Sequence, residues 1–144
     1  MPDTTGSSEA PTPADLLSQM PFAVRLGVQL QTAQPQETVA TLTWTEDLCT
    51  AGGALHGGAL MSLGDTAGAV CAFLNLPPGA GTTTVESKTN FLRAVRSGSV
   101  RAISRPLHAG STLVVVQTSL SDDKDRLVGQ MTQSQLVLPA PTPD

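Results

Sequence analysis

The chain of 144 residues is long enough for one domain and too short for two well-packed ones. Eight basic and twelve acidic residues give a formal net charge of −4, which argues against a nucleic-acid-binding protein, because such proteins gain affinity by neutralising phosphates. The sequence does not open with a basic segment followed by an apolar one, so we expect no secretory signal and predict a cytoplasmic protein.

The two ends of the sequence are rich in proline, threonine and serine. Residues 1–13 (MPDTTGSSEAPTP) and 139–144 (PAPTPD) lack an apolar period, so they cannot bury enough surface to offset the entropy lost on ordering. We predict a tail at each end and one folded domain over residues 14–138.

Cysteines and histidines are few. Cys49 and Cys71 have neither the spacing of a zinc ligand set nor that of a CxxC redox pair, and His56 and His108 are isolated from each other. We predict two reduced thiols, no metal site and no cofactor.

The first predicted elements are short. Residues 14–20 have a helical pattern that ends before Pro21. From Val24 to Leu30 apolar and other residues alternate, which predicts a half-buried strand, and residues 38–45 predict a second strand. Pro35 and Gln36 supply a turn between the two strands, so we expect a hairpin.

A long apolar helix is predicted next. After a glycine-rich link the helical pattern runs from His56 to about Leu76, where Pro77, Pro78 and Gly79 end it. Its length raises the possibility of a membrane span, since roughly 20 apolar residues cross a bilayer. Asp65 would lie near the bilayer centre, and no lysine or arginine brackets the segment, so we predict a buried helix and no membrane partner.

The second half returns to strands, separated by turns that are typical of an antiparallel meander. The predicted strands are residues 82–92, 99–107, 112–120 and 127–138. Because one helix cannot cover itself in so small a chain, we predict an α+β fold in which a curved antiparallel sheet wraps around one long central helix.

The two faces of the predicted helix differ. On a helical wheel one face is a core stripe of Leu60, Leu63, Ala67, Val70 and Leu74, and the other carries Gly58, Met61, Asp65, Gly68, Ala69 and Ala72. Asp65 is the only charged residue between His56 and Leu76, among neighbours that are mostly too small to cover it. We expect that face to be approached closely by something outside the helix.

A lone carboxylate of this kind could also be merely exposed, or bonded to a neighbouring backbone, serine or threonine group. Gly57 and Gly58 favour a functional interpretation, because they open the helix, leave backbone N–H groups unpaired at its positive end and let a ligand approach the backbone. A carboxylate and an electrophile stabiliser on one helix form a plausible acyl-transfer site.

The segment HGGALMSLGDTA, residues 56–67, resembles the HGG-x(6)-D signature of hotdog-fold acyl-CoA thioesterases of the phenylacetate-degradation type. The resemblance extends over residues 24–138, including the strand 84–92 and the hairpin around residues 108–110. It implies a homodimer, often a dimer of dimers and thus a homotetramer, whose two helices lie inside one continuous sheet with active sites between subunits.

The resemblance also implies roles for individual residues. Asp65 would be the general base or nucleophile, the Gly57 N–H would polarise the thioester carbonyl, and His56 would shape the turn. Thr84 falls where relatives often carry a serine or threonine that helps to place water. Thr50 departs from the family, which commonly has asparagine or glutamine there, and this puts substrate range and rate in doubt more than reaction type.

The leading hypothesis is hydrolysis of an acyl-CoA to free acid and CoA. Gly58 and Met61 share the Asp65 face and are candidate substrate contacts. Residues 87–121 contain no acidic residue, and within them Arg93 and Arg96 are candidates to meet the CoA phosphates. The alternative is that these arginines are simply solvated on exposed strand faces.

Two other functions remain open from the sequence. A hotdog enoyl-thioester hydratase or dehydratase would generally pair a carboxylate with a catalytic histidine, whereas His56 belongs to the glycine turn and His108 to a hairpin. A non-catalytic acyl-CoA-binding protein is the third possibility, although no DNA-binding helix pair accompanies the predicted domain. Whether the acyl group is aromatic or aliphatic is left open.

Overall fold

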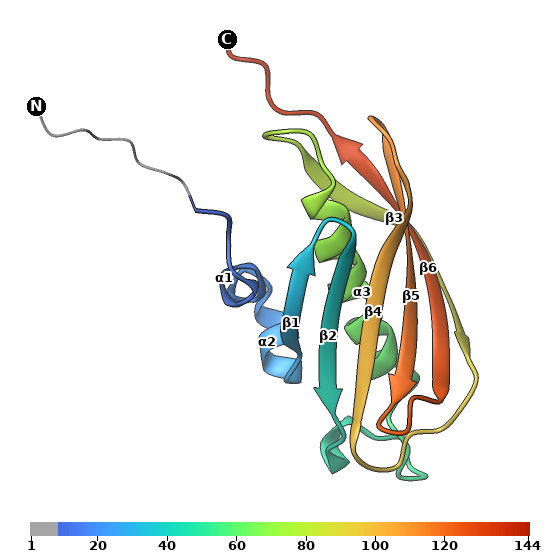
Figure 1. Cartoon of the computed structure of the whole chain (residues 1–144). Helices are drawn as coiled ribbons and strands as arrows, with labels where there is room; N and C mark the ends of the chain where they lie inside the picture. Colours follow the sequence, from blue (N-terminus) through green and yellow to red (C-terminus); the bar gives the residue numbers. More distant parts are fainter. Residues whose placement is uncertain (1–8) are drawn as a thin grey trace, which may run out of the picture.

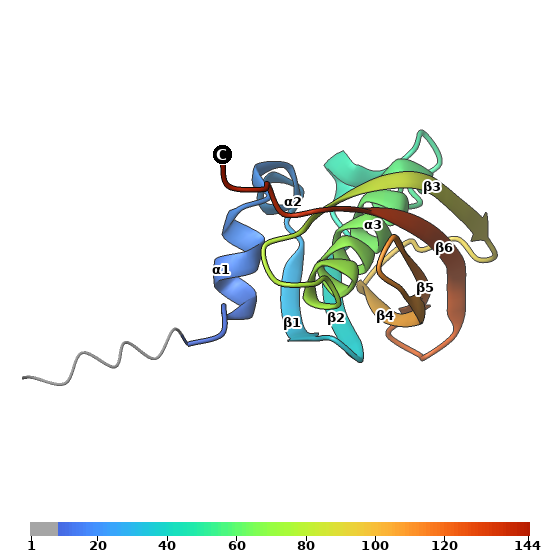
Figure 2. The same ribbon diagram turned by 90° about the horizontal axis from the view of Figure 1, so that it is seen from above.

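The computed structural model describes residues 9–144 (Figure 1). Six antiparallel strands form one sheet in the order β1-β2-β4-β5-β6-β3, and the sheet curves around the long helix α3 (Figure 2). The elements are α1 (Pro13–Ser18), α2 (Pro21–Leu26), β1 (Gln29–Gln34), β2 (Glu37–Thr43), a 3-10 turn (Glu46–Leu48), α3 (Gly57–Leu74), β3 (Gly81–Phe91), β4 (Ser99–Ala109), β5 (Leu113–Asp122) and β6 (Leu127–Leu138). The predicted fold class is confirmed.

The core lies between α3 and the concave face of the sheet. The predicted stripe on α3 is buried except for its last member, Leu74, which is half-buried. Alternate residues of the strands meet it, among them Ala40, Leu42, Val100, Ala102, Leu120 and Val128. Within the described residues only α3 is long and apolar enough to cross a membrane, and 56% of it is buried inside the fold, as in the core helix of a soluble protein.

The strand predicted from Val24 to Leu30 is wrong, because its first part forms the helix α2. Pro21 occupies the first turn, where its fixed φ and missing N–H suit a helix start. Gly27 then ends the helix in the left-handed region, at φ +93°. Val24 is 52% exposed, so the apparent alternation did not correspond to one buried face.

The meander prediction holds for β4, β5 and β6 but fails for β3. This strand does not pair with β4, its successor in the chain, but crosses to the far edge of the sheet and pairs with β6. The turn at residues 97–98 was correctly predicted, but a turn between two strands did not make β3 pair with β4. As a result, β3 and β6 lie side by side against one flank of α3.

The small-residue face of α3 is only partly open, because the chain's own sheet approaches part of it closely. Gly68 and Ala72 are buried by the chain's own sheet, whereas Gly58, Met61 and Asp65 are exposed. Gly64 is also buried, and a Cβ built there would lie 3.0 Å from the Met131 Cε of β6. Glycines on this flank therefore let β6 approach the helix closely.

Candidate active site

The start of α3 is capped in a way that leaves one backbone donor free. The His56 Nδ1 accepts the Gly58 N–H at 2.8 Å, and the His56 carbonyl accepts the N–H groups of Ala59 and Leu60. Within the described residues no acceptor bonds the Gly57 N–H. That group therefore points out of the positive end of the helix and can donate to an incoming oxygen.

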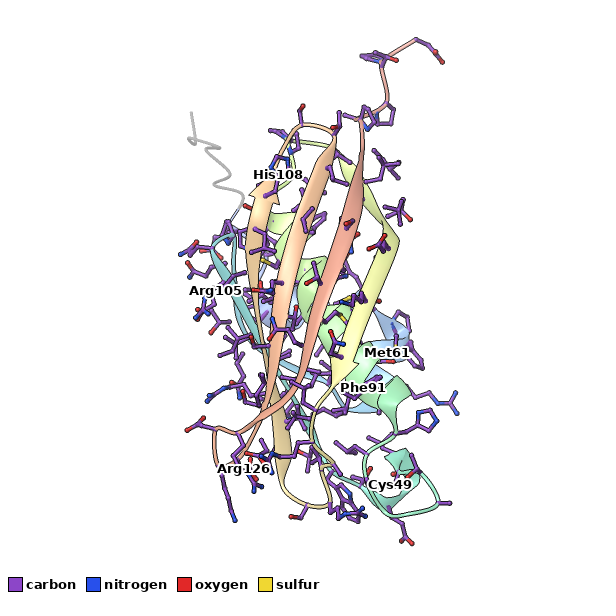
Figure 3. The ribbon with its side chains drawn as sticks, turned by 90° about the vertical axis from the view of Figure 1, so that its right-hand side faces the viewer. Cys49, Met61, Phe91, Arg105, His108 and Arg126 are labelled. Atoms are coloured by element: carbon purple, nitrogen blue, oxygen red, sulfur yellow. The ribbon has the colours of Figure 1, made fainter. Side chains whose placement is uncertain are left out.

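A cavity of about 480 Å³ opens beside this donor. Its lining consists of Ala54, Leu55, Gly57, Leu60, Phe91, Leu92, Arg93 and Ala94. A Cβ built on Gly57 would lie only 3.1 Å from the Phe91 Cζ, so a side chain here would crowd the ring. Phe91 and Met61 lie toward the end of the sheet where α3 begins (Figure 3).

The Asp65 carboxylate is exposed, and a side chain of the sheet holds one of its oxygens. The buried Gln133 of β6 donates its Nε2–H to the Asp65 Oδ1 at 3.0 Å. The nearby hydroxyls of Ser62 and Thr66 instead donate to carbonyls of their own helix. Asp65 is thus not satisfied by a serine or threonine, and a long-range amide contact orients it.

Thr84 is held in a similar way by the next inward residue of β6. The buried Gln135 donates its Nε2–H to the Thr84 Oγ1 at 2.7 Å, and its Oε1 accepts from the Thr82 hydroxyl at 3.2 Å. The Thr84 hydroxyl can therefore direct its own proton away from the amide. Asp65 and Thr84 are each held by one of two adjacent inward glutamines.

The remaining predicted residues divide into two groups. Gly58 and Met61 are exposed on the Asp65 face of α3, and Arg93 lines the Gly57 cavity. Thr50 instead accepts the Gly52 N–H within the link before α3, and Arg96 donates to the Gly52 carbonyl. The structure therefore ties Thr50 and Arg96 to this link.

A second, apolar cavity of about 260 Å³ lies between α1 and α3. Its lining consists of Leu16, Gln19, Met20, Ala69, Val70, Phe73 and Thr82. Ala69 follows Asp65 by one helical turn, which brings this cavity close to the carboxylate.

Cys71 and His108 are two further side chains that could react. Burial raises the pKa of the Cys71 thiol to about 11, so it stays protonated at neutral pH and is a poor nucleophile. His108 lies at the end of the sheet opposite to the start of α3 (Figure 3). The described part of the chain contains no group of three residues able to bind a metal.

The sequence analysis did not identify Gln133 and Gln135 as residues of the site. Residues 127–138 were correctly predicted as a strand, and its inward positions alternate through Met131, Gln133, Gln135 and Val137. Two amides in that otherwise apolar series indicate a polar site inside the fold, since buried polar groups need hydrogen-bond partners. Their partners lie 51 and 68 residues away, so the sequence alone could not name them.

Comparison with known proteins identifies the family. A sequence profile described as the Thioesterase superfamily matches residues 52–129, more than half of the chain. The chain belongs to the thioesterase superfamily. The profile spans the region from the link before α3 to the beginning of β6, and so includes the glycine turn and Asp65.

Similar proteins extend over most of this thioesterase-superfamily chain. A "Putative esterase" of Mycobacterium tuberculosis is 30% identical over 122 residues, 83% of this chain and 87% of that protein. The 1,4-dihydroxy-2-naphthoyl-CoA hydrolase of Escherichia coli is 37% identical over 75 residues, 52% of this chain and 55% of that protein. A thioesterase structure from Haemophilus influenzae superposes with a TM-score of 0.83 at 25% identity, covering 88% and 90% of the two chains. The fold is that of a hotdog thioesterase, and the protein is a hydrolase of this superfamily.

Proposed function

We propose that the protein hydrolyses acyl-CoA thioesters and that Asp65 is the reacting carboxylate. The observation that supports this most directly is the exposed Asp65 side chain, the only charged group of α3, with one oxygen held by a buried amide. The CoA hydrolase of Escherichia coli among the similar proteins supports the CoA thioester as substrate class.

As a general base, Asp65 takes a proton from water while the hydroxide adds to the thioester carbonyl carbon. The negative charge that develops on the carbonyl oxygen is stabilised by the Gly57 N–H and the positive end of α3. The C–S bond then breaks, and the CoA thiolate leaves and is protonated. In the alternative, the carboxylate attacks directly to give an anhydride that water hydrolyses.

One chain cannot supply both groups to the same thioester. Asp65 follows Gly57 by eight residues, which corresponds to a rise of about 12 Å along the helix. A carbonyl that accepts from the Gly57 N–H is therefore out of reach of the Asp65 of its own chain. We infer a homodimer in which each site takes Gly57 from one chain and Asp65 from the other.

The cavities suggest how the substrate lies in this site. Arg93 lines the cavity at Gly57 and can meet the CoA phosphates, because no ion pair with an acidic side chain is found for it within the described residues. The apolar cavity at Ala69 can take the acyl group. Hydratase chemistry is less well supported, since the His56 Nδ1 is used to cap α3 and His108 lies at the far end of the sheet.

The proposal is tested with Asp65→Asn, which preserves shape but removes the base and the charge. We expect kcat for CoA release to fall by about 10³-fold or more while KM changes little, because the group acts mainly in the transition state. Melting temperature and oligomeric state provide the folding controls. Near wild-type hydrolysis by the folded variant would exclude Asp65, and wild-type protein that binds acyl-CoA without releasing CoA would favour the non-catalytic alternative.

A further inference from the structure

The buried side-chain amide of Gln133 has a hydrogen-bonded N–H group and an oxygen without a partner within the described residues. Its side chain is fully buried on the inward face of β6, where the strand partners are Ser87 of β3 and Val116 of β5. Its Nε2–H bonds Asp65, but its Oε1 is buried with no partner within the described residues. A buried oxygen without a hydrogen bond destabilises a fold, and an apolar side chain of similar volume would avoid that cost.

The helix provides room for this amide. A Cβ at Gly68 would overlap the Gln133 Oε1, so only glycine fits there while the amide keeps its place. A Cβ at Gly64, one turn earlier, would face the flexible end of Met131 at 3.0 Å and the Leu120 Cδ2 at 3.9 Å. The amide orientation is also determined, because the reverse orientation would set the Gln133 Oε1 against the Asp65 carboxylate.

We propose that Gln133 is the positioning residue of the Asp65 carboxylate and that Gly68, which has no side chain, leaves the space that this contact requires. The inference rests on the proposed function of Asp65. The amide holds the Asp65 Oδ1 toward the sheet, which leaves the second oxygen on the open side for water or substrate. No other charged group of the neighbouring strands takes part, since Glu86 and Lys88 of β3 pair with the outward residues Ser134 and Thr132.

The first test is Gln133→Met, which keeps the volume and removes the donor. We expect kcat to fall by about 10²-fold, because a displaced catalytic group costs rate on this scale, with KM changed by less than about 3-fold. Thr118→Val is the control, since it breaks another fully buried side-chain hydrogen bond, to Ser104, without touching Asp65. Wild-type kcat in folded Gln133→Met, alongside an inactive Asp65→Asn, would overturn the positioning role and leave the proposed function standing.

The second test fills the space beside Gly68 with a methyl group. Gly68→Ala should displace the amide and lower kcat as Gln133→Met does, and combining the two should add little, because both break the same contact. Gly64→Ala adds the same methyl group one turn earlier, where the end of Met131 can move, and should retain kcat. Equal losses in both alanine variants would assign the effect to helix packing and overturn the proposal.

The third test works even where the first variants fold poorly. Gln133→Glu keeps the shape but sets a second carboxyl group at hydrogen-bond distance from Asp65, where two ionised groups repel. The acidic limb of the kcat/KM profile should move to higher pH by about one unit or more. An unchanged profile in an active variant would contradict the contact, and a similar profile shift in Thr118→Val would assign it to general core damage.

Discussion

The two flanks of α3 differ in how they meet the sheet. The flank with Leu60, Leu63 and Ala67 packs aliphatic side chains against β2, β4 and β5. The flank with Gly57, Gly64 and Gly68 presents backbone, so that Phe91, Met131 and Gln133 of β3 and β6 come close. The first arrangement buries apolar area, whereas the second brings selected side chains of the sheet to the helix backbone and to Asp65.

If Asp65 reacts as proposed, this difference predicts that stability and chemistry are separated around one helix. Substitutions on the aliphatic flank should lower the free energy of unfolding and spare the reaction in molecules that remain folded. Substitutions at Gly57 and Gly68 on the glycine flank should alter the reaction more than their packing cost suggests, whereas Gly64→Ala should not. The predictions below test this separation.

The largest effect is expected from mixing two inactive chains. Gly57→Val should lower kcat by about 10²- to 10³-fold, because the added side chain crowds Phe91 and blocks the approach to the N–H donor. Co-expressed with Asp65→Asn, it should form mixed dimers that each contain one site with both native groups. Random pairing then restores about a quarter of wild-type activity.

The outcome separates this mechanism from simple damage to the turn. Mixed dimers that gain nothing over the parent variants would contradict a site shared between chains. Gly57→Val alone should also keep the pH dependence set by the reacting carboxylate. If it only lowers the melting temperature and retains activity per folded molecule, Gly57 serves the turn and not the carbonyl oxygen.

An intermediate effect is expected on the aliphatic flank. Leu63 is fully buried, so Leu63→Ala should lower the free energy of unfolding by about 2–5 kcal/mol through lost burial and a residual cavity. Urea denaturation measures this free energy, and one fixed protein concentration keeps the comparison valid for the proposed homodimer. kcat per folded molecule should stay within about 3-fold of wild type. A loss of kcat as large as that of Gln133→Met would show that the two flanks are not separate.

The smallest effect is expected at Arg93, which lines the cavity beside Gly57. Arg93→Ala should raise KM for acyl-CoA by roughly 3- to 5-fold without changing kcat, since an exposed charge contributes about 1 kcal/mol or less. The increase should shrink at high salt. Arg101→Ala is the control, because Arg101 pairs with Asp125 in a different part of the sheet. Equal KM changes in both variants would indicate a general charge effect and exclude a local contact.

Local sequence patterns were sufficient to predict a helix or strand where that element is long or bounded by strong start and stop signals. The helix predicted from His56 to Leu76 matches α3 closely, because its apolar period is sustained and proline follows it. The strand at residues 127–138 was predicted with the same bounds as β6. α2 was missed because six residues are too few to distinguish a helical period from a strand period.

The sequence by itself determined the helix, the strands of the second half, the glycine turn and the lone carboxylate, because each depends on neighbours within a few residues. Only the tertiary structure decided that β3 pairs with β6, that Gly68 is buried, and that Gln133 reaches Asp65 across 68 positions of sequence. The physical reason is that strand pairing and buried hydrogen bonds are selected by the packing of the whole chain, which no local pattern contains.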